Sequence, residues 1–202
     1  MRRLPFVFAA VLAIVAPHTA STSDKAKPVK STTALSEDEI ALYKAVLRIY
    51  GGGKDASLNV SDRTFPLDPK LPTAGLDQPE CLVGVQLDNL PTVSNTYHEL
   101  SPEVLPTKAM KLVDPRAQSG IVRSNDPSNT IRKGKPVNDA VTAAFANGLF
   151  SMSEIAFDKE HHFAALRYSF WCGSLCGHGS TLVFEKTNGE WRNVRNCGGW
   201  VS

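Results

Sequence analysis

The alternating pattern of the last fifty or so residues constrains the fold of this chain more than any other feature. From Ser151 onward apolar and polar residues alternate, as in the run that holds Ala164, Leu166, Tyr168 and Phe170. A period of two places successive side chains on opposite faces of a β-strand. The pattern therefore predicts a sheet with one apolar face, which another layer of the protein must cover.

Short turns divide this region into four predicted strands, at 155–157, 162–171, 181–186 and 191–197. Asn188-Gly189 separates the last two and favours a tight hairpin, because both central positions of such a turn prefer residues that tolerate positive φ. Consecutive strands joined by short turns are antiparallel. We therefore expect a four-strand antiparallel meander at the C-terminus.

A glycine-rich turn that contains Cys172, Cys176 and His178 joins the second of these strands to the third. The chain has four cysteines, an even number that is typical of a disulfide framework in an oxidising compartment. We predict that Cys172 pairs with Cys176 and that Cys81 pairs with Cys197. Two other connectivities, in which Cys81 bonds either turn cysteine, remain open on the sequence.

The hairpin turn also fixes which residues share one end of the sheet. It sets Cys197 opposite Ser180, at the same end as the cysteine turn. His161 and His162 begin the long strand and lie roughly 30 Å from that turn, at about 3.3 Å per residue. These two histidines are therefore excluded from any metal site at the turn.

Two alternatives would place chemistry at the cysteine turn. Cys172, Cys176, Cys197 and His178 are a candidate zinc set, but their spacing is not a strong zinc pattern and exported thiolates tend to pair. Thiol redox catalysis usually places its cysteines at a helix N-terminus, whereas this turn lies between strands. We favour a structural disulfide and keep a thiol-redox or metal-dependent enzyme as the alternative.

Two helices are predicted before the meander. Ser36 and Glu39 form a capping box for a helix over 37–50, and the glycines from Gly51 onward end it. A second helix follows Pro136 and ends near Gly148.

Between these helices, the segment 113–135 contains Asp114-Pro115 and Asp126-Pro127 and is predicted to be mostly turn, with a strand around 120–123. The fold class expected from these elements is α+β: two main helices packed on an antiparallel sheet.

The N-terminus has the order of a secretory signal. Arg2 and Arg3 precede eleven uncharged apolar residues at 6–16, and small or turn-forming residues follow at 17–20. Eleven residues are too few for a membrane-spanning helix, which needs about 20. We predict a cleaved signal peptide over 1–20, a flexible tether over 21–35 and a single α+β domain over 36–202.

The charge balance narrows the choice of partners. The whole chain has 22 basic and 20 acidic residues, and removal of Arg2 and Arg3 with the signal leaves 20 of each. A nucleic-acid-binding protein needs a basic excess to neutralise phosphates. We therefore expect no nucleic-acid partner and, after signal cleavage, no transmembrane segment.

The sequence gives little support for a hydrolase. His98, Glu99 and Glu103 lie together in a polar segment, but the chain contains neither G-x-S-x-G nor H-E-x-x-H. A hydrolase that uses His98 or Glu103 is therefore a minor hypothesis.

Several C-terminal segments together resemble a group of uncharacterised exported bacterial proteins: 155–157, 164–168, the cysteine turn, 182–186, 188–191 and the terminal Trp200-Val201-Ser202. The resemblance extends more weakly to 37–50 and 58–64. It implies export and an α+β fold, and it carries over no catalytic residue.

The sequence thus predicts a periplasmic or extracellular protein that needs no cofactor. We expect a non-enzymatic binding or envelope protein, whose partner is another protein or a small molecule.

Overall fold

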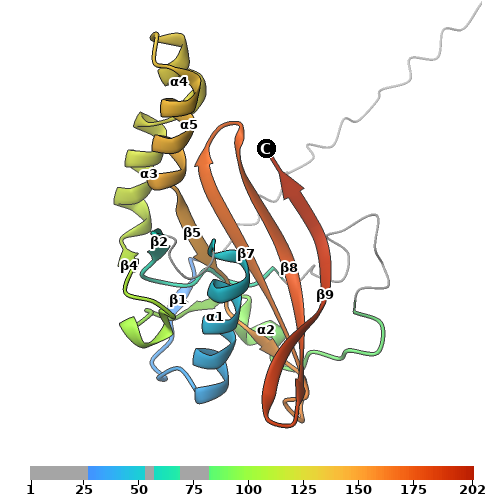
Figure 1. Ribbon diagram of the computed structural model, residues 1–202. Coiled ribbons are helices and arrows are strands. Elements are labelled where there is room, and N and C mark those ends of the chain that lie inside the picture. The colour runs from blue at the N-terminus through green and yellow to red at the C-terminus, as the bar shows by residue number, and fades with distance from the viewer. Residues whose placement is uncertain (1–26, 53–56, 69–81) are drawn as a thin grey trace, which may run out of the picture.

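A seven-stranded mixed sheet organises the computed structural model, which describes residues 27–52, 57–68 and 82–202 (Figure 1). The strand order is β4-β2-β5-β7-β8-β9, with β6 beside β7. The strands are β2 (Leu58–Ser61), β4 (Met110–Val113), β5 (Leu149–Met152), β6 (Ala156–Phe157), β7 (Phe163–Gly173), β8 (Cys176–Thr187) and β9 (Glu190–Val201). A separate two-stranded sheet pairs β1 (Val29–Lys30) with β3 (Thr96–Tyr97).

The helices are α1 (Glu37–Tyr50), α2 (Leu90–Val93), α3 (Pro115–Ser124), α4 (Pro127–Arg132) and α5 (Val137–Ala146), with a 3-10 turn at Pro102–Val104. The α+β class is confirmed. The expected antiparallel sheet is only partly confirmed, because β2 runs parallel to both of its neighbours, β4 and β5. Parallel neighbours require crossover connections, and α3, α4 and α5 form the crossover between β4 and β5.

The helix predicted at 37–50 is confirmed as α1. The Ser36 hydroxyl accepts a hydrogen bond from the Glu39 N–H, and the Glu39 carboxylate accepts one from the Ser36 N–H, which completes the capping box. The buried face of α1 consists of Leu42, Tyr43, Val46 and Leu47.

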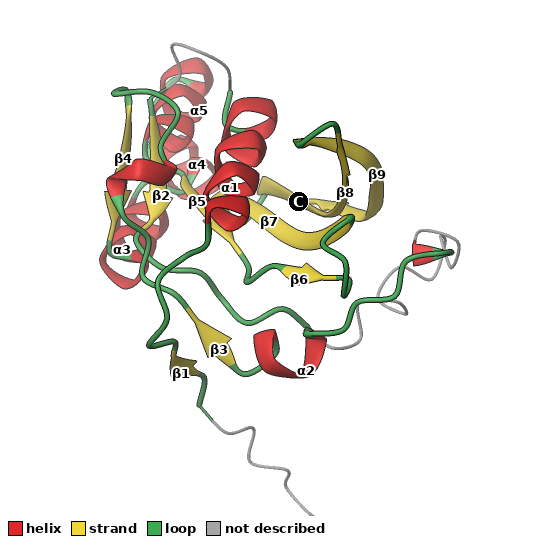
Figure 2. Ribbon diagram, turned by 90° about the horizontal axis from the view of Figure 1, so that it is seen from below, coloured by secondary structure: helices red, strands yellow, loops and turns green. Residues whose placement is uncertain are grey.

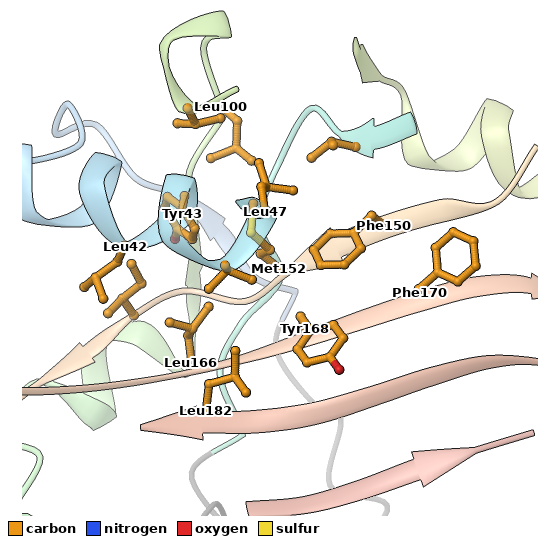
Figure 3. Close-up of a cluster of buried hydrophobic side chains, with 14 of the residues drawn as sticks. Leu42, Tyr43, Leu47, Leu100, Phe150, Met152, Leu166, Tyr168, Phe170 and Leu182 are labelled. Carbon is orange, nitrogen blue, oxygen red and sulfur yellow. The ribbon is translucent and has the colours of Figure 1, made fainter. Parts of the chain in front are cut away.

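This face of α1 packs on the apolar face of the sheet (Figure 3). Phe150 and Met152 project from β5, Leu166 from β7 and Leu182 from β8 into the same cluster, and all four are fully buried. Burial of apolar surface is the main favourable contribution to folding. Figure 2 shows α1 on one side of β6 and β7, and α2 with β1 and β3 on the other side.

The prediction of turns and a strand over 113–135 is wrong, because the structure forms α3 and α4 there. Asp114 caps α3 through a bond from the Ala117 N–H, and Asp126 caps α4. In both helices the following proline occupies the first helical position. A backbone N–H at that position has no partner within the helix, so proline loses no hydrogen bond there. The Asp-Pro pairs are therefore helix starts.

The helix predicted after Pro136 is confirmed as α5. The C-terminal meander is confirmed as β6-β7-β8-β9, with every neighbouring pair antiparallel. Asn188 and Gly189 have φ values of 54° and 80°, as the predicted hairpin requires. The predicted register holds near the turn and then shifts by one residue between Val183 and Phe184. Cys197 therefore lies opposite Thr181 and not opposite Ser180.

The N-terminal predictions fall partly outside the described residues. The signal peptide over 1–20 lies outside them, as does the tether up to residue 26. Within the rest of the predicted tether, Val29 and Lys30 form β1. This strand forms because its backbone bonds to β3, and such bonds do not depend on apolar side chains. No helix in the described ranges is long and apolar enough to cross a membrane.

We predict that Leu182→Ala destabilises the protein by about 2–5 kcal/mol, because it leaves a cavity between the sheet and α1. The exposed Val194→Ala on β9 is the control and should change the free energy of unfolding by less than about 0.5 kcal/mol. Urea denaturation measures both. Equal effects of the two substitutions would contradict the proposed core.

Candidate functional site: an aromatic pocket at the ends of two helices

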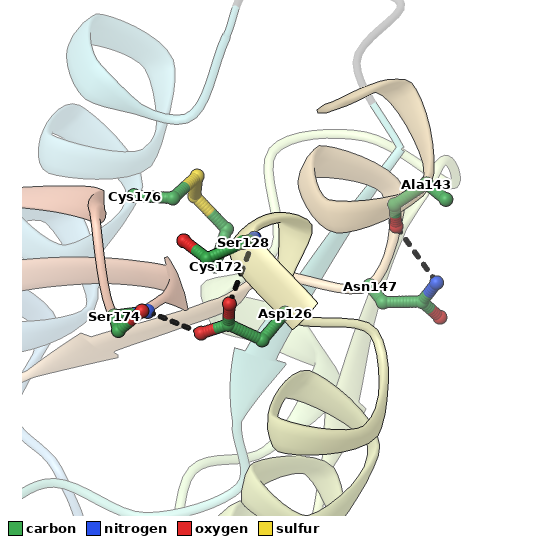
Figure 4. The surroundings of a disulfide bond; sticks show 7 residues. All are labelled: Asp126, Ser128, Ala143, Asn147, Cys172, Ser174 and Cys176. Carbon is green, nitrogen blue, oxygen red and sulfur yellow. Dashed lines mark hydrogen bonds between the residues drawn. A yellow bond between two sulfur atoms is a disulfide. The ribbon is translucent and has the colours of Figure 1, made fainter. Parts of the chain in front are cut away.

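The predicted bond between Cys172 and Cys176 is present and closes the turn between β7 and β8 (Figure 4). Their Cα atoms lie 5.0 Å apart. No cysteine within the described ranges is free. Cys81 lies outside those ranges, so its pairing with Cys197 stays a prediction.

A buried carboxylate anchors the cysteine turn. Asp126 accepts a hydrogen bond of 2.6 Å from the Ser174 backbone N–H, and its other oxygen accepts one of 2.9 Å from the Ser128 N–H at the start of α4. Gly173 has a φ of 148°, and an added Cβ would lie 2.7 Å from the Pro127 ring. The turn therefore fits against α4 only with glycine at this position.

The hydrogen bonds to Asp126 affect the reactivity of the two cysteines in the turn. The Ser174 N–H is the main cause of a lowered pKa at Asp126, and the Asn129 and Ser128 N–H groups add to it, while burial opposes it. The negative charge of Asp126 is thus held against the turn, where it disfavours a nearby thiolate. This arrangement suits a structural disulfide better than a reactive one.

The structure does not assemble the candidate zinc set. The sulfur atoms of Cys172 and Cys176 are bonded to each other. The His178 ring packs against Tyr168 and Phe170, with ring centroids 5.7 and 5.6 Å apart. Among the described residues, no group of three or more His, Cys, Asp or Glu side chains is arranged to hold a metal ion.

His98 has a carboxylate partner that the sequence did not indicate. Its Nδ1 lies 2.8 Å from Glu154 Oε2, and its backbone N–H donates to Glu154 Oε1. The Thr64 hydroxyl also donates to Glu154, whose side chain is 2% exposed. Thr33 Oγ1 lies 3.3 Å from the other nitrogen of His98, so that hydroxyl, imidazole and carboxylate form a line.

We assign a structural role to this line of side chains. The three donors of Glu154 come from the segments that follow β2 and β3, so the carboxylate ties both segments to the end of β5. The other acids considered for hydrolysis lie apart from it. Glu99 pairs with Lys30 at 2.7 Å, and Glu103 accepts from the Ser101 hydroxyl.

A pocket with a volume of about 340 Å³ opens where α1 and α5 end above the sheet. Its lining comes from four segments: the end of α1 (Tyr50, Gly51, Gly52), the start of β2 (Ser57, Leu58), the end of α5 (Phe145, Ala146), and the sheet (Phe170, His178). Concave sites with mostly apolar linings and few polar groups are typical of small-molecule binding.

Four residues of the described lining carry aromatic rings: Tyr50, Phe145, Phe170 and His178. Tyr50 stacks on Tyr168 at 4.6 Å, and Phe145 stacks on Phe170 at 5.8 Å. The Tyr50 hydroxyl donates to side-chain oxygens of Asn193 and Asn196 on β9, which fixes the ring. Burial, followed by the proximity of Tyr50, raises the pKa of Tyr168, so its phenol stays neutral.

Phe145 is the exposed member of this group, with 54% of its surface accessible. The sequence placed Tyr50 at the end of a helix that the glycines from Gly51 onward terminate, and it placed Phe145 within a second helix that ends near Gly148. Those assignments are correct locally. The pocket was missed because its lining is assembled from segments that only the tertiary structure brings together.

Comparison with known protein families, curated proteins and solved structures finds no match to this chain. The site is therefore interpreted from its own geometry.

We predict that Asp126→Asn destabilises the protein by about 1 kcal/mol near neutral pH, because a charged cap is replaced by a neutral one. The native pKa of Asp126 is lowered, so its contribution is present above the ordinary carboxyl range near pH 4. The contribution is lost as the pH falls through the native pKa. The difference between wild type and variant should therefore shrink in acid.

Denaturant unfolding of both proteins at a series of pH values measures this difference. Asp139→Asn, an exposed first-turn acid of α5, is the control and should have a smaller effect. A difference for Asp126→Asn that is constant down to about pH 2 would contradict the assigned role.

Proposed function

We propose that this chain is an exported, non-enzymatic binding protein that holds a small, partly apolar ligand in the aromatic pocket. The observation that carries the proposal is the cavity itself, walled by Tyr50, Phe145 and Phe170 and open to solvent at Phe145. An exposed phenylalanine beside a cavity is a surface that ligand binding would cover.

The composition of the pocket supports binding over catalysis. The described lining holds one imidazole, that of His178, and no carboxylate. Acid–base and nucleophilic catalysis usually need at least two converging groups within hydrogen-bond reach. The pocket walls are suited instead to retain a ring or an alkyl group by burial and stacking.

Export is supported by the basic and apolar N-terminal segment and by the disulfide between Cys172 and Cys176. The same two features support a periplasmic or extracellular location. A small molecule is the preferred partner because the concave surface is too small for a stable protein–protein interface.

We predict that N-phenyl-1-naphthylamine, a neutral aromatic probe, binds the wild-type protein with an increase in fluorescence. Ala146→Trp fills the pocket from the exposed end of α5 and should weaken binding by about tenfold or more. Ile121→Trp, at an exposed position on α3, is the control and should bind the probe as wild type does.

Fluorescence titration measures the three dissociation constants, and circular dichroism confirms that each variant is folded. Equal binding by all three proteins, or no binding by the wild type, would overturn the proposal.

A thiol–disulfide oxidoreductase is the second candidate function. It is favoured by one observation: two residues between the bonded cysteines, Ser174 and Leu175, are exposed, Leu175 to 74%. The carboxylate of Asp126, which caps α4 and is hydrogen-bonded to this turn, argues against it.

Redox titration in glutathione buffers separates the two candidates. We predict a reduction potential below about −300 mV, as is typical of structural disulfides. A potential above about −270 mV, in the range of thioredoxin and stronger oxidants, would favour the oxidoreductase.

A further inference from the structure

We propose that the group held in the aromatic pocket is an organic cation, of the alkylammonium class. This inference rests on the proposed function and adds the charge of the ligand to it. Three features of the described lining point the same way: the ring faces, the direction of two helices and the distribution of charged side chains.

The ring faces supply the first feature. The planes of Tyr50 and Tyr168 lie 26° apart, and those of Phe145 and Phe170 also lie 26° apart. The face of an aromatic ring is negative and attracts a cation within about 6 Å of its centroid. Tyr50 from the first stack and Phe145 and Phe170 from the second belong to the lining, so three of these rings border the space that a cation would occupy.

The helices supply the second feature. α1 has 14 residues and α5 has 10, and both end at the pocket. The carboxyl end of a helix carries about half a negative charge, which favours a cation. The Asn59 amide donates to the carbonyls of Ala146 and Gly148 after α5, but it is neutral and brings no positive charge.

Charged side chains supply the third feature. No lysine or arginine belongs to the described lining, and Arg48 in the last turn of α1 is exposed and lies outside it. His178 is the described lining residue that carries an imidazole. Among the described lining residues, an anion would therefore meet two negative helix ends and no lysine or arginine, whereas a cation would be stabilised by both helix ends and by the rings.

The size of the cavity adds a constraint on the ligand. A volume of about 340 Å³ lies at the lower end of the range for small-molecule sites and exceeds that of a lone trimethylammonium group. The ligand is therefore expected to carry an apolar portion, an aryl or alkyl group, beside its cationic head.

A pair of probes tests this inference. Phenyltrimethylammonium and tert-butylbenzene have nearly the same shape and differ by one positive charge. At about pH 8, where imidazoles in general are neutral, we expect the cation to bind about tenfold more tightly in low salt. Displacement of N-phenyl-1-naphthylamine measures both affinities.

Phe145 provides the matched variants, because it is exposed and can change without opening the core. Phe145→Leu keeps an apolar wall and removes the ring, so it should reduce the preference for the cation severalfold. Phe145→Tyr keeps the ring and should keep the preference. Ala146→Trp should weaken binding of both probes.

The outcomes separate this inference from the proposed function. If tert-butylbenzene binds as tightly as the cation, the charge assignment is wrong and the pocket remains a binding site. If the cation binds but Ala146→Trp leaves its affinity unchanged, it binds elsewhere and the inference fails. If neither these two probes nor the naphthylamine binds, the inference and the proposed function fail together.

Discussion

The packing of α1 against the twisted sheet is the interaction on which the rest of the structure depends. The residues that α1 buries contact side chains from β5, β7 and β8, so one helix joins the parallel and antiparallel parts of the sheet. Tyr43 donates a hydrogen bond to the Ser153 carbonyl, which satisfies its hydroxyl inside this core. Without α1, the apolar faces of three strands would be exposed to water.

The pocket is a consequence of the same packing. α1 ends at Tyr50 because the following glycines terminate it, and α5 ends two residues before Gly148. Gly148 has no side chain because an added Cβ would lie 2.3 Å from the Phe170 ring. The sheet continues past both helix ends, where the Phe170 ring lines the site and the Tyr168 ring stacks on Tyr50.

The cysteine turn has a structural role that is separate from the role proposed for the pocket. Asp126 and the disulfide fix the tip of the β7–β8 hairpin against α4, and His178 lies two residues beyond Cys176 on β8. A rigid tip holds the His178 ring at the pocket wall. In the proposed binding function, the disulfide therefore has a structural role and positions a lining residue.

Local features of the sequence determined the elements that depend on local physics. The capping box at Ser36 set the start of α1, and Asn188-Gly189 set the hairpin because few other residues adopt positive φ there. The alternation of apolar and polar residues after Ser151 determined the strands of the C-terminal meander. The Asp-Pro pairs were misinterpreted because the same dipeptide begins a turn or caps a helix, and the residues that follow decide between them.

Only the tertiary structure decided the parallel pairing of β2, the partner of His98 and the pocket. Each of these joins segments that are far apart in the chain: β2 pairs with β5 across about ninety residues, and Glu154 meets His98 across 56. Periodicity reports which face of an element is buried, but it does not report what lies against that face. The chemistry of the site therefore came from the way the helix ends and the sheet pack together.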